Sequence, residues 1–88
     1  MIWKVEFDER ARKELRRLDR QAQVNILSYL RTRIATHEDP RRFGDPLQKT
    51  LIGLWKYQVG PYRIICDVCE NVVTVRILRV GHRKNVYE

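Results

Sequence analysis

The sequence predicts an α+β domain in which a two-helix hairpin covers one face of a small antiparallel sheet. Three observations predict this class. Residues 2–6 alternate apolar and polar side chains as a short strand does, and residues 8–36 repeat apolar residues at helical spacing. Residues 54–80 alternate again across two turns, which predicts a three-strand C-terminal meander. The 88 residues contain no repeat or linker, so a single domain spanning 1–88 is expected.

The two predicted helices are joined by almost no loop. Asp8 fits the N-cap of the first helix, and Asp19 fits the N-cap of a second helix that ends near Thr36. The apolar stripe of the first helix is Ala11, Leu15 and Leu18. The stripe of the second helix is Gln23, Ile26, Leu27, Leu30 and Ile34.

Residues 37–53 are the least regular part of the chain. Pro40 and Pro46 interrupt any helix there, and Gly44 permits a turn. Leu47 and Leu51 are expected to anchor this segment to the core.

The register of the meander follows from its first turn. Gly60 and Pro61 are expected to form a two-residue hairpin loop, because glycine adopts the positive φ that such turns need. With a second turn at residues 70–71, the face toward the helices carries Trp55, Tyr57, Val59, Tyr62, Ile64, Cys66, Val68, Val73, Val75 and Ile77. The other face carries Lys56, Gln58, Arg63, Ile65, Asp67, Thr74, Arg76 and Leu78.

The chain is strongly basic, with 18 lysines and arginines against 11 acidic residues and a net charge of +7. This balance favours contact with phosphate backbones or with an acidic partner. No stretch has the composition of a signal peptide or the roughly 20 apolar residues of a membrane span. We therefore expect a cytoplasmic protein with no membrane partner.

The two cysteines, Cys66 and Cys69, have the spacing of a redox or zinc motif. Within a strand, however, positions three apart point to opposite faces, and no second pair of ligands follows. We expect free thiols, no metal and no cofactor.

Four groups of residues occur in an order that is typical of one protein family. They are Phe7-Asp8-Glu9-Arg10-Ala11, Asp39-Pro40-Arg41-Arg42, Gly53-Leu54-Trp55-Lys56-Tyr57 with Gly60-Pro61-Tyr62-Arg63, and Val80-Gly81-His82-Arg83-Lys84-Asn85-Val86-Tyr87. Through them the chain resembles the RelE/ParE superfamily of bacterial type II toxin–antitoxin systems, and its RelE branch in particular. The resemblance covers nearly the whole chain.

The resemblance implies a function and a set of partners. RelE-branch toxins cut messenger RNA in the ribosomal decoding site, whereas ParE-branch toxins poison DNA gyrase and lack the cutting residues. The implied partners are a cognate acidic RelB-like antitoxin, the ribosome with its message, and operator DNA only through the antitoxin. Carried over by motif, the catalytic residues are Lys56, Arg63, His82, Arg83 and Tyr87. The chain departs from the family pattern at Gln58, where a second basic residue is common, and at Pro61, where an acidic residue is common.

The implied reaction is metal-independent attack of the RNA 2′-hydroxyl on the adjacent phosphate. It requires a base, cations for the crowded phosphate and an acid for the leaving oxygen. His82 is a candidate base or acid and Lys56 a second candidate base, while Arg63 and Arg83 suit the phosphate. Tyr87 suits base stacking or orientation of the 2′-hydroxyl. Further RNA contacts are expected at Gln58, Arg76, Lys84, Arg12, Lys13 and Arg16.

Two alternatives remain open from the sequence. One is a gyrase poison on the same fold, against which the polar tail with Arg83 and Tyr87 argues. The other is a catalytically weak module that binds an antitoxin or nucleic acid, which the departures at Gln58 and Pro61 keep open. Each surface cation also has the simpler interpretation of a solvated helix or sheet face.

Overall fold

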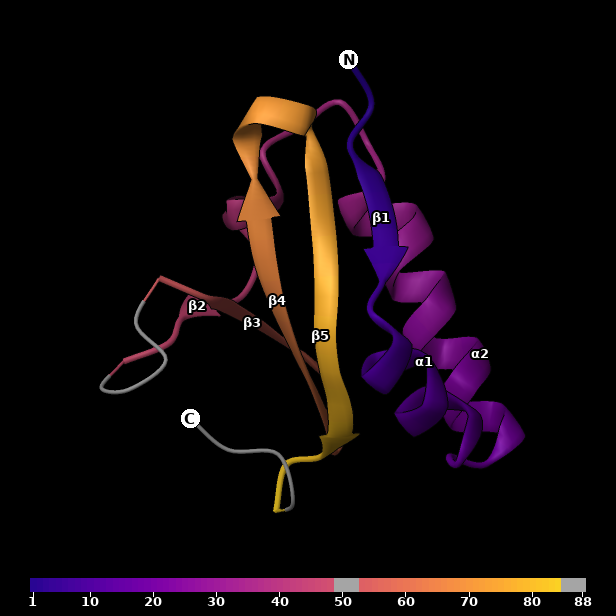
Figure 1. Cartoon of the computed structure of the whole chain (residues 1–88). Helices are drawn as coiled ribbons and strands as arrows, with labels where there is room; N and C mark the ends of the chain where they lie inside the picture. The colour runs from indigo at the N-terminus through magenta and orange to yellow at the C-terminus, as the bar shows by residue number, and fades with distance from the viewer. Residues whose placement is uncertain (49–52, 85–88) are drawn as a thin grey trace.

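The computed structural model describes residues 1–48 and 53–84. Along the chain the elements are β1 (Lys4–Phe7), α1 (Glu9–Arg16), α2 (Arg20–Tyr29), a π turn η1 (Leu30–Ile34), a 3-10 turn η2 (Pro40–Arg42), β2 (Asp45–Pro46), β3 (Trp55–Val59), β4 (Tyr62–Cys69), a 3-10 turn η4 (Glu70–Val72) and β5 (Thr74–His82). Figure 1 shows the two helices together on one side of the sheet.

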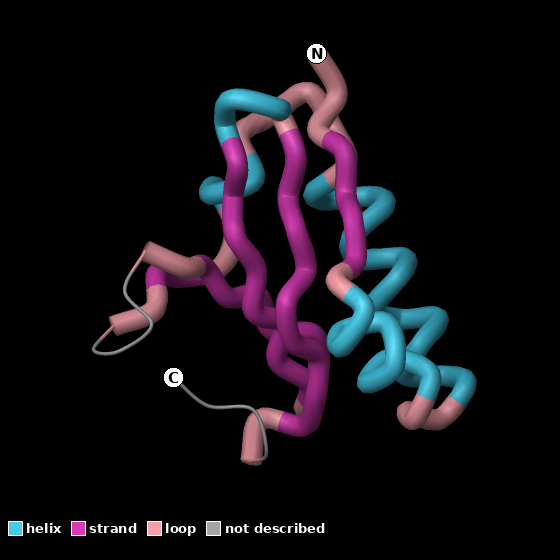
Figure 2. The backbone as a smooth tube through the Cα atoms, in the orientation of Figure 1, coloured by secondary structure: helices cyan, strands magenta, loops and turns pink. Residues whose placement is uncertain are grey.

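The sheet has five strands in the order β1-β5-β4-β3-β2, and the α+β class is confirmed (Figure 2). The predicted meander is present, since β3, β4 and β5 pair in antiparallel fashion. The N-terminal strand differs from the expectation of an all-antiparallel sheet. It pairs in parallel with β5, from Lys4 opposite Thr74 to Phe7 opposite Ile77, so the sheet is mixed. The direction of β1 relative to β5 depends on the path that the chain takes through the helices between them. Local periodicity does not reveal this path.

The two helix starts use their aspartates differently. The Asp19 carboxylate accepts a hydrogen bond from the Ala22 N–H at 2.7 Å, as expected of an N-cap. Asp8 occupies the N-cap position of α1, but its side chain makes no capping hydrogen bond. It accepts instead from Arg76 Nη2 at 3.2 Å, which links the start of α1 to β5.

The main core lies between the helices and the sheet. It contains Ala11, Leu15, Ile26, Leu30 and Ile34 from the helical layer, packed on Tyr57, Ile64, Cys66, Val75, Ile77 and Val80 from the strands. Leu27 was predicted in the buried stripe, but it is 45% exposed. The buried stripe of α2 runs instead through Ala22 and Ile26.

A β-bulge divides β5. Cys66 pairs with Ile77 but Ile65 pairs with Arg79, so Leu78 is an extra residue in β5. The bulge shifts the alternation by one residue and returns Val80 to the helix-covered face, where it is 2% exposed. The alternation read from the sequence therefore holds only as far as Ile77.

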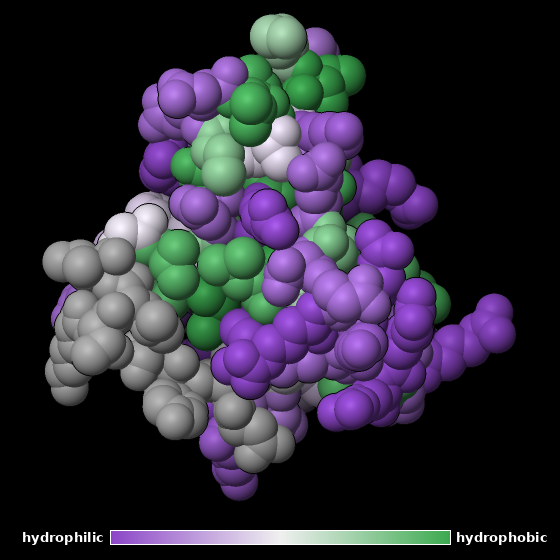
Figure 3. All heavy atoms as spheres, viewed as in Figure 1, coloured by the Kyte–Doolittle hydropathy of each residue, from purple (hydrophilic) through white to green (hydrophobic). Residues whose placement is uncertain are grey.

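The face opposite the helices also carries a small apolar cluster. Ile65 and Leu47 are 2% and 1% exposed there, with Leu54 packed against them. The predicted anchoring by Leu47 is thus confirmed, and that by Leu51 lies outside the described residues. The space-filling view shows an apolar patch among hydrophilic side chains (Figure 3).

Gly44 is required where the chain just before β2 approaches β3. It has φ +77°, and a Cβ built on it would lie 2.1 Å from the Lys56 carbonyl oxygen. Only glycine allows this approach. Across residues 1–48 and 53–84, no helix combines the length and apolar character needed to traverse a bilayer.

Candidate functional site

The sheet face opposite the helices gathers Lys56, Gln58 and Arg63 beside the β3–β4 turn. Gln58 lies directly opposite Arg63, and Lys56 lies opposite Ile65. Lys56 and Arg63 are therefore diagonal neighbours, about 7–8 Å apart at the backbone. The turn itself is the predicted one, with Gly60 at φ +58° and Val59 paired with Tyr62.

Arg63 is half-buried on this face, and its Nε atom is buried without a hydrogen-bond partner among the described residues. A buried donor left unpaired costs stability, by about 1–3 kcal/mol in typical cases. Native chains keep few such groups, and each one needs an explanation such as a catalytic role, strain, or a bound water or ion. Arg63 is therefore the residue of this face whose placement is least explained by folding.

Arg83 comes close to the same turn through its backbone. Its N–H donates to the Pro61 carbonyl at 2.9 Å, just beyond the pair formed by Arg63 and Gly81. The Arg83 side chain is exposed, as is that of Lys84. The structure thus brings Lys56, Arg63 and Arg83 to one end of the sheet, while Tyr87 lies outside the described residues.

His82 is not on the face that carries Lys56 and Arg63. It pairs with Tyr62, and the two rings meet edge to face with centroids 6.0 Å apart. Tyr62 packs against the helix-covered core, so His82 lies on that side of β5. The His82 Nδ1 atom accepts from the Lys84 N–H at 3.2 Å, which leaves Nε2 as the proton-bearing nitrogen of the neutral ring.

The remaining predicted RNA contacts lie elsewhere. In the register of β4 and β5, Arg76 lies opposite Asp67, and Asp67 is four residues along β4 from Arg63. That separation is about 13 Å along a strand. Arg76 and Arg12 line a shared polar hollow next to β1, while Lys13 and Arg16 are exposed on α1.

Glu14 and Arg79 form a contact to which the sequence assigned no role. Arg79 Nε lies 3.0 Å from Glu14 Oε2, and the Val80 N–H donates to Glu14 Oε1 at 2.9 Å. Pairing between β1 and β5 ends at Ile77, so the carboxylate takes the place of a strand carbonyl beyond that point. The partners are 65 and 66 residues apart in the chain, and no local pattern signals such a contact.

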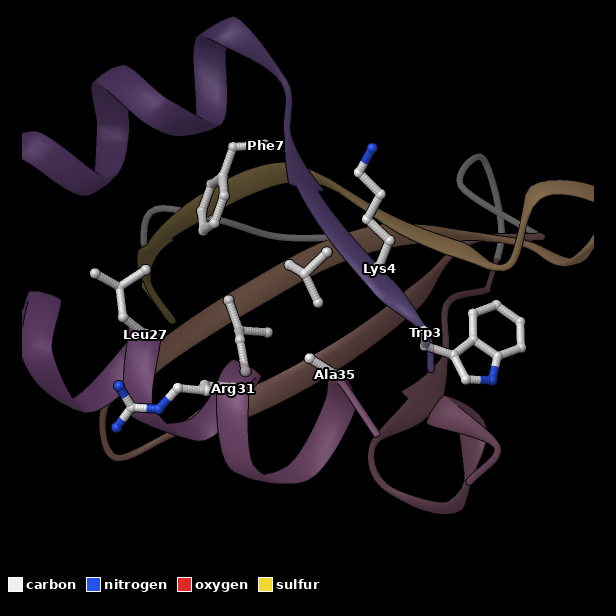
Figure 4. A pocket seen from close by; sticks show the side chains of 8 residues that line it. Trp3, Lys4, Phe7, Leu27, Arg31 and Ala35 are labelled. Carbon is white, nitrogen blue, oxygen red and sulfur yellow. The ribbon is translucent and has the colours of Figure 1, made fainter. Parts of the chain in front are cut away.

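A second hollow is apolar and lies between β1 and α2. This groove of about 330 Å³ is lined by Trp3, Val5, Phe7, Leu27, Leu30 and Ala35, together with Lys4 and Arg31. Figure 4 shows Phe7 and Leu27 facing this space and the Lys4 ammonium directed away from it. Val24, at 50% exposure, and Ile2, at 60%, add further exposed apolar surface to the protein. An uncovered apolar groove with basic neighbours is typical of a protein-binding surface.

The cysteines are free thiols, as expected. Burial raises the pKa of the Cys66 thiol to about 12, so it stays protonated and unreactive near neutral pH. Within residues 1–48 and 53–84, no three His, Cys, Asp or Glu side chains come together as metal ligands do.

The fold is that of small RelE-type toxins. A chain in the crystal structure of the toxin–antitoxin complex RelBE2 from Mycobacterium tuberculosis matches with a TM-score of 0.85 and 29% identity, over 94% of this chain and 93% of that one. The isolated Escherichia coli RelE toxin shares the fold at a TM-score of 0.71 and 22% identity, over 91% and 83%.

Sequence comparison then gives the family. Toxin RelG of Mycobacterium tuberculosis (strain ATCC 25618 / H37Rv) is 30% identical over 87 residues, which are 99% of this chain and 98% of the relative. The family profile described as ParE toxin of type II toxin-antitoxin system, parDE, matches residues 5–87. The chain belongs to this ParE toxin family, and the predicted resemblance to RelE-like toxins is confirmed.

Proposed function

We propose that this toxin is an endoribonuclease that cuts messenger RNA on the ribosome and so inhibits translation. The observation that carries the proposal is the grouping of Lys56, Arg63 and the Arg83 backbone at one end of the sheet face opposite the helices. Two positions in this group hold permanent guanidinium charges, which suit a phosphate that gains charge in the transition state. The RelE-type fold of its relatives supports the same assignment.

In the proposed reaction, the 2′-hydroxyl attacks the neighbouring phosphate, the bond between phosphorus and the 5′-oxygen breaks, and the leaving 5′-oxygen takes a proton from water. The new bond yields a 2′,3′-cyclic phosphate and a 5′-hydroxyl end. Lys56 is the candidate to accept the 2′-hydroxyl proton, and Arg63 and Arg83 bind the phosphate oxygens. Tyr87 retains its predicted role in stacking or in orienting the 2′-hydroxyl.

His82 receives a different proposed role from the one predicted. Its contacts with Tyr62 and the Lys84 N–H suit a residue that holds the start of the tail. Because Gln58 cannot carry charge and no imidazole of the described residues shares the face with Lys56, the group has little acid–base capacity of its own. A ribosome that positions the message supplies rate enhancement through orientation, and this favours ribosome dependence.

We further propose an acidic RelB-like antitoxin as the partner that restrains the toxin. The net charge of +7 and the apolar groove beside β1 suit a segment with apolar residues among acidic ones. RelB-type partners are present in the solved E. coli RelBE complex and in the archaeal RelE–RelB complex from Pyrococcus horikoshii. Contact with operator DNA is expected only through the antitoxin.

The test is translation in vitro with purified ribosomes and a defined message, with RNA ends mapped by primer extension. We expect breaks only when ribosomes are present, and rates about 100-fold lower for Arg63→Ala and Arg83→Ala. Arg20→Ala, which removes an equal charge from the exposed start of α2, is the matched control and should cut normally.

An intact message with wild-type toxin would refute the nuclease proposal. A parallel gyrase supercoiling assay then decides the alternative, because a gyrase poison leaves the message whole and accumulates cleaved DNA.

A further inference from the structure

An arginine–aromatic cluster follows α2, and the proposed function does not use it. It consists of Arg33, Arg42 and Phe43, together with Tyr29 at the end of α2. The guanidinium carbon of Arg42 lies 4.6 Å from the centre of the Phe43 ring, and that of Arg33 lies 5.4 Å from the same centre. Arg33 also lies 5.8 Å from the centre of the Tyr29 ring.

The segment that carries the cluster is fixed to the rest of the fold. The Trp55 indole N–H donates to the Phe43 carbonyl at 2.7 Å. The buried Tyr57 hydroxyl donates to the Pro40 carbonyl at 2.8 Å. Tyr29 packs against both the Phe43 and Tyr57 rings. The two arginines therefore stack on aromatic rings that are held in place by contacts with the core. These rings do not need a ligand to adopt their positions.

The cluster keeps positive charge available to a ligand. The guanidinium carbons of Arg33 and Arg42 lie near the same Phe43 ring centre. They are therefore no more than about 10 Å from each other. Among the described residues Arg33 has no ion pair, and Arg42 pairs at 3.6 Å only with Glu38, whose side chain is 70% exposed. Exposed pairs of this kind hold weakly and are easily displaced. Arg42 Nη1 also donates to the Asp39 carbonyl at 3.3 Å and to Thr36 Oγ1 at 3.5 Å, so among the described residues its Nη2 is the nitrogen left for a phosphate. A guanidinium stacked on a ring presents its N–H edge, which matches phosphate oxygens.

The position of the cluster relates it to the candidate site. Trp55 and Tyr57 point to the helix side of β3, where they contact the cluster segment, whereas Lys56 between them points to the other face. The cluster and the Lys56–Arg63 face thus lie on opposite sides of the same strand. β2 is the edge strand beside β3 and pairs with it at Lys56 and Trp55, so a nucleic-acid strand that contacts both sides would pass around this edge of the sheet.

We propose that Arg33 and Arg42 bind RNA phosphates as a second contact, across β3 from the candidate catalytic face. The choice of RNA as the ligand rests on the proposed function. An acidic peptide is the less suitable ligand, because both arginines already occupy the aromatic surface and the apolar groove lies elsewhere, beside β1. Phosphates need only the charges and the N–H edges.

The test measures binding of a fluorescently labelled, single-stranded 2′-O-methyl RNA to the full chain by anisotropy. This RNA cannot be cleaved by 2′-hydroxyl attack, so the result does not depend on nuclease activity. Arg33→Ala/Arg42→Ala should bind about tenfold more weakly at low salt. Its plot of log affinity against log salt should be shallower by about 1.4, the value for two lost phosphate contacts on a single strand.

Two further variants keep the test decisive. Arg17→Ala/Arg20→Ala removes the same charge from exposed positions near the α1–α2 junction and should leave the slope nearly unchanged. Arg33→Lys/Arg42→Lys restores point charges and should recover most of the slope. Thermal melts of each variant identify a temperature at which all are folded, and binding is compared there.

Equal losses in the two alanine pairs, or a lysine pair that does not recover the slope, would overturn the inference. Normal RNA binding with weakened binding of an acidic peptide would overturn it in favour of a protein partner. If RNA binding depends on Arg33 and Arg42 while ribosome-bound message stays intact, the contact stands and the proposed nuclease function fails.

Discussion

Glu14→Ala should destabilise the fold through the end of β5. The Glu14 side chain is 19% exposed, and it accepts hydrogen bonds from the Val80 N–H and from Arg79 Nε. Removing it leaves the Val80 N–H without an acceptor, since β1 no longer pairs with β5 at that level. An unsatisfied N–H costs about 1–3 kcal/mol. The lost ion pair adds about 0.2–1 kcal/mol, because the Arg79 side chain is 31% exposed and solvent screens it.

The expected loss is about 2 kcal/mol in the free energy of unfolding, or a fall of roughly 8 °C or more in melting temperature for a chain of this size. Glu14→Gln keeps an oxygen for the Val80 N–H and gives up only the charge, so its loss should stay below about 1 kcal/mol. Glu9→Gln, in the exposed first turn of α1, is the matched control for loss of a carboxylate.

Urea unfolding followed by tryptophan fluorescence measures these differences, and amide hydrogen exchange locates them. The Val80 amide should exchange faster in Glu14→Ala than in wild type. A Glu14→Ala protein within about 0.5 kcal/mol of wild type, with Val80 still protected, would refute the reasoning that the carboxylate substitutes for a strand partner.

Three other outcomes are expected. Gly44→Ala should lower stability by about 2–4 kcal/mol, because a Cβ there meets the Lys56 carbonyl and φ is +77°; an unchanged urea midpoint would contradict this. Stability should fall as pH rises from 9 toward 12, because the unfolded Cys66 thiol ionises near its ordinary pKa of 9.0 while the buried thiol holds its proton to about 12. Cys66→Ala should flatten that decline in urea titrations at several pH values, and an equally steep decline would assign it to other groups. Tyr57→Phe should cost about 1 kcal/mol, since the Pro40 carbonyl loses its buried donor; a melt equal to wild type would show that water replaces the bond.

The sequence predicts this fold well wherever short-range patterns decide the structure. The β3–β4 register follows from the Gly60 turn and from alternation that buries Tyr57 and Ile64. Asp19 is the N-cap of the second helix as predicted, because its carboxylate caps the backbone locally, and α2 begins at Arg20. The parallel direction of β1 was missed, since it depends on the path of the chain through both helices.

The candidate site was predictable in part for the same reason. Lys56 and Arg63 share a face because two strands and a tight turn determine their positions. His82 was predicted to join them. The extra residue Leu78, however, shifts the alternation of β5 before it reaches His82, which therefore lies on the other face. Contacts such as Glu14 with Val80 join residues that are distant in the chain, and they become visible only in three dimensions.

The Leu78 bulge makes β5 act as two half-strands of opposite phase joined end to end. The first half directs odd-numbered residues such as Val75 toward the helices, and the second directs even-numbered ones such as Val80. Loss of Leu78 itself would remove the bulge and leave His82 opposite Tyr62, whereas regular pairing of Leu78 with Ile65 would move His82 to the other side of the sheet. In the evolution of such a strand, a one-residue deletion at the bulge therefore keeps the side on which each later residue projects, while the same deletion in a strand without a bulge would exchange the sides.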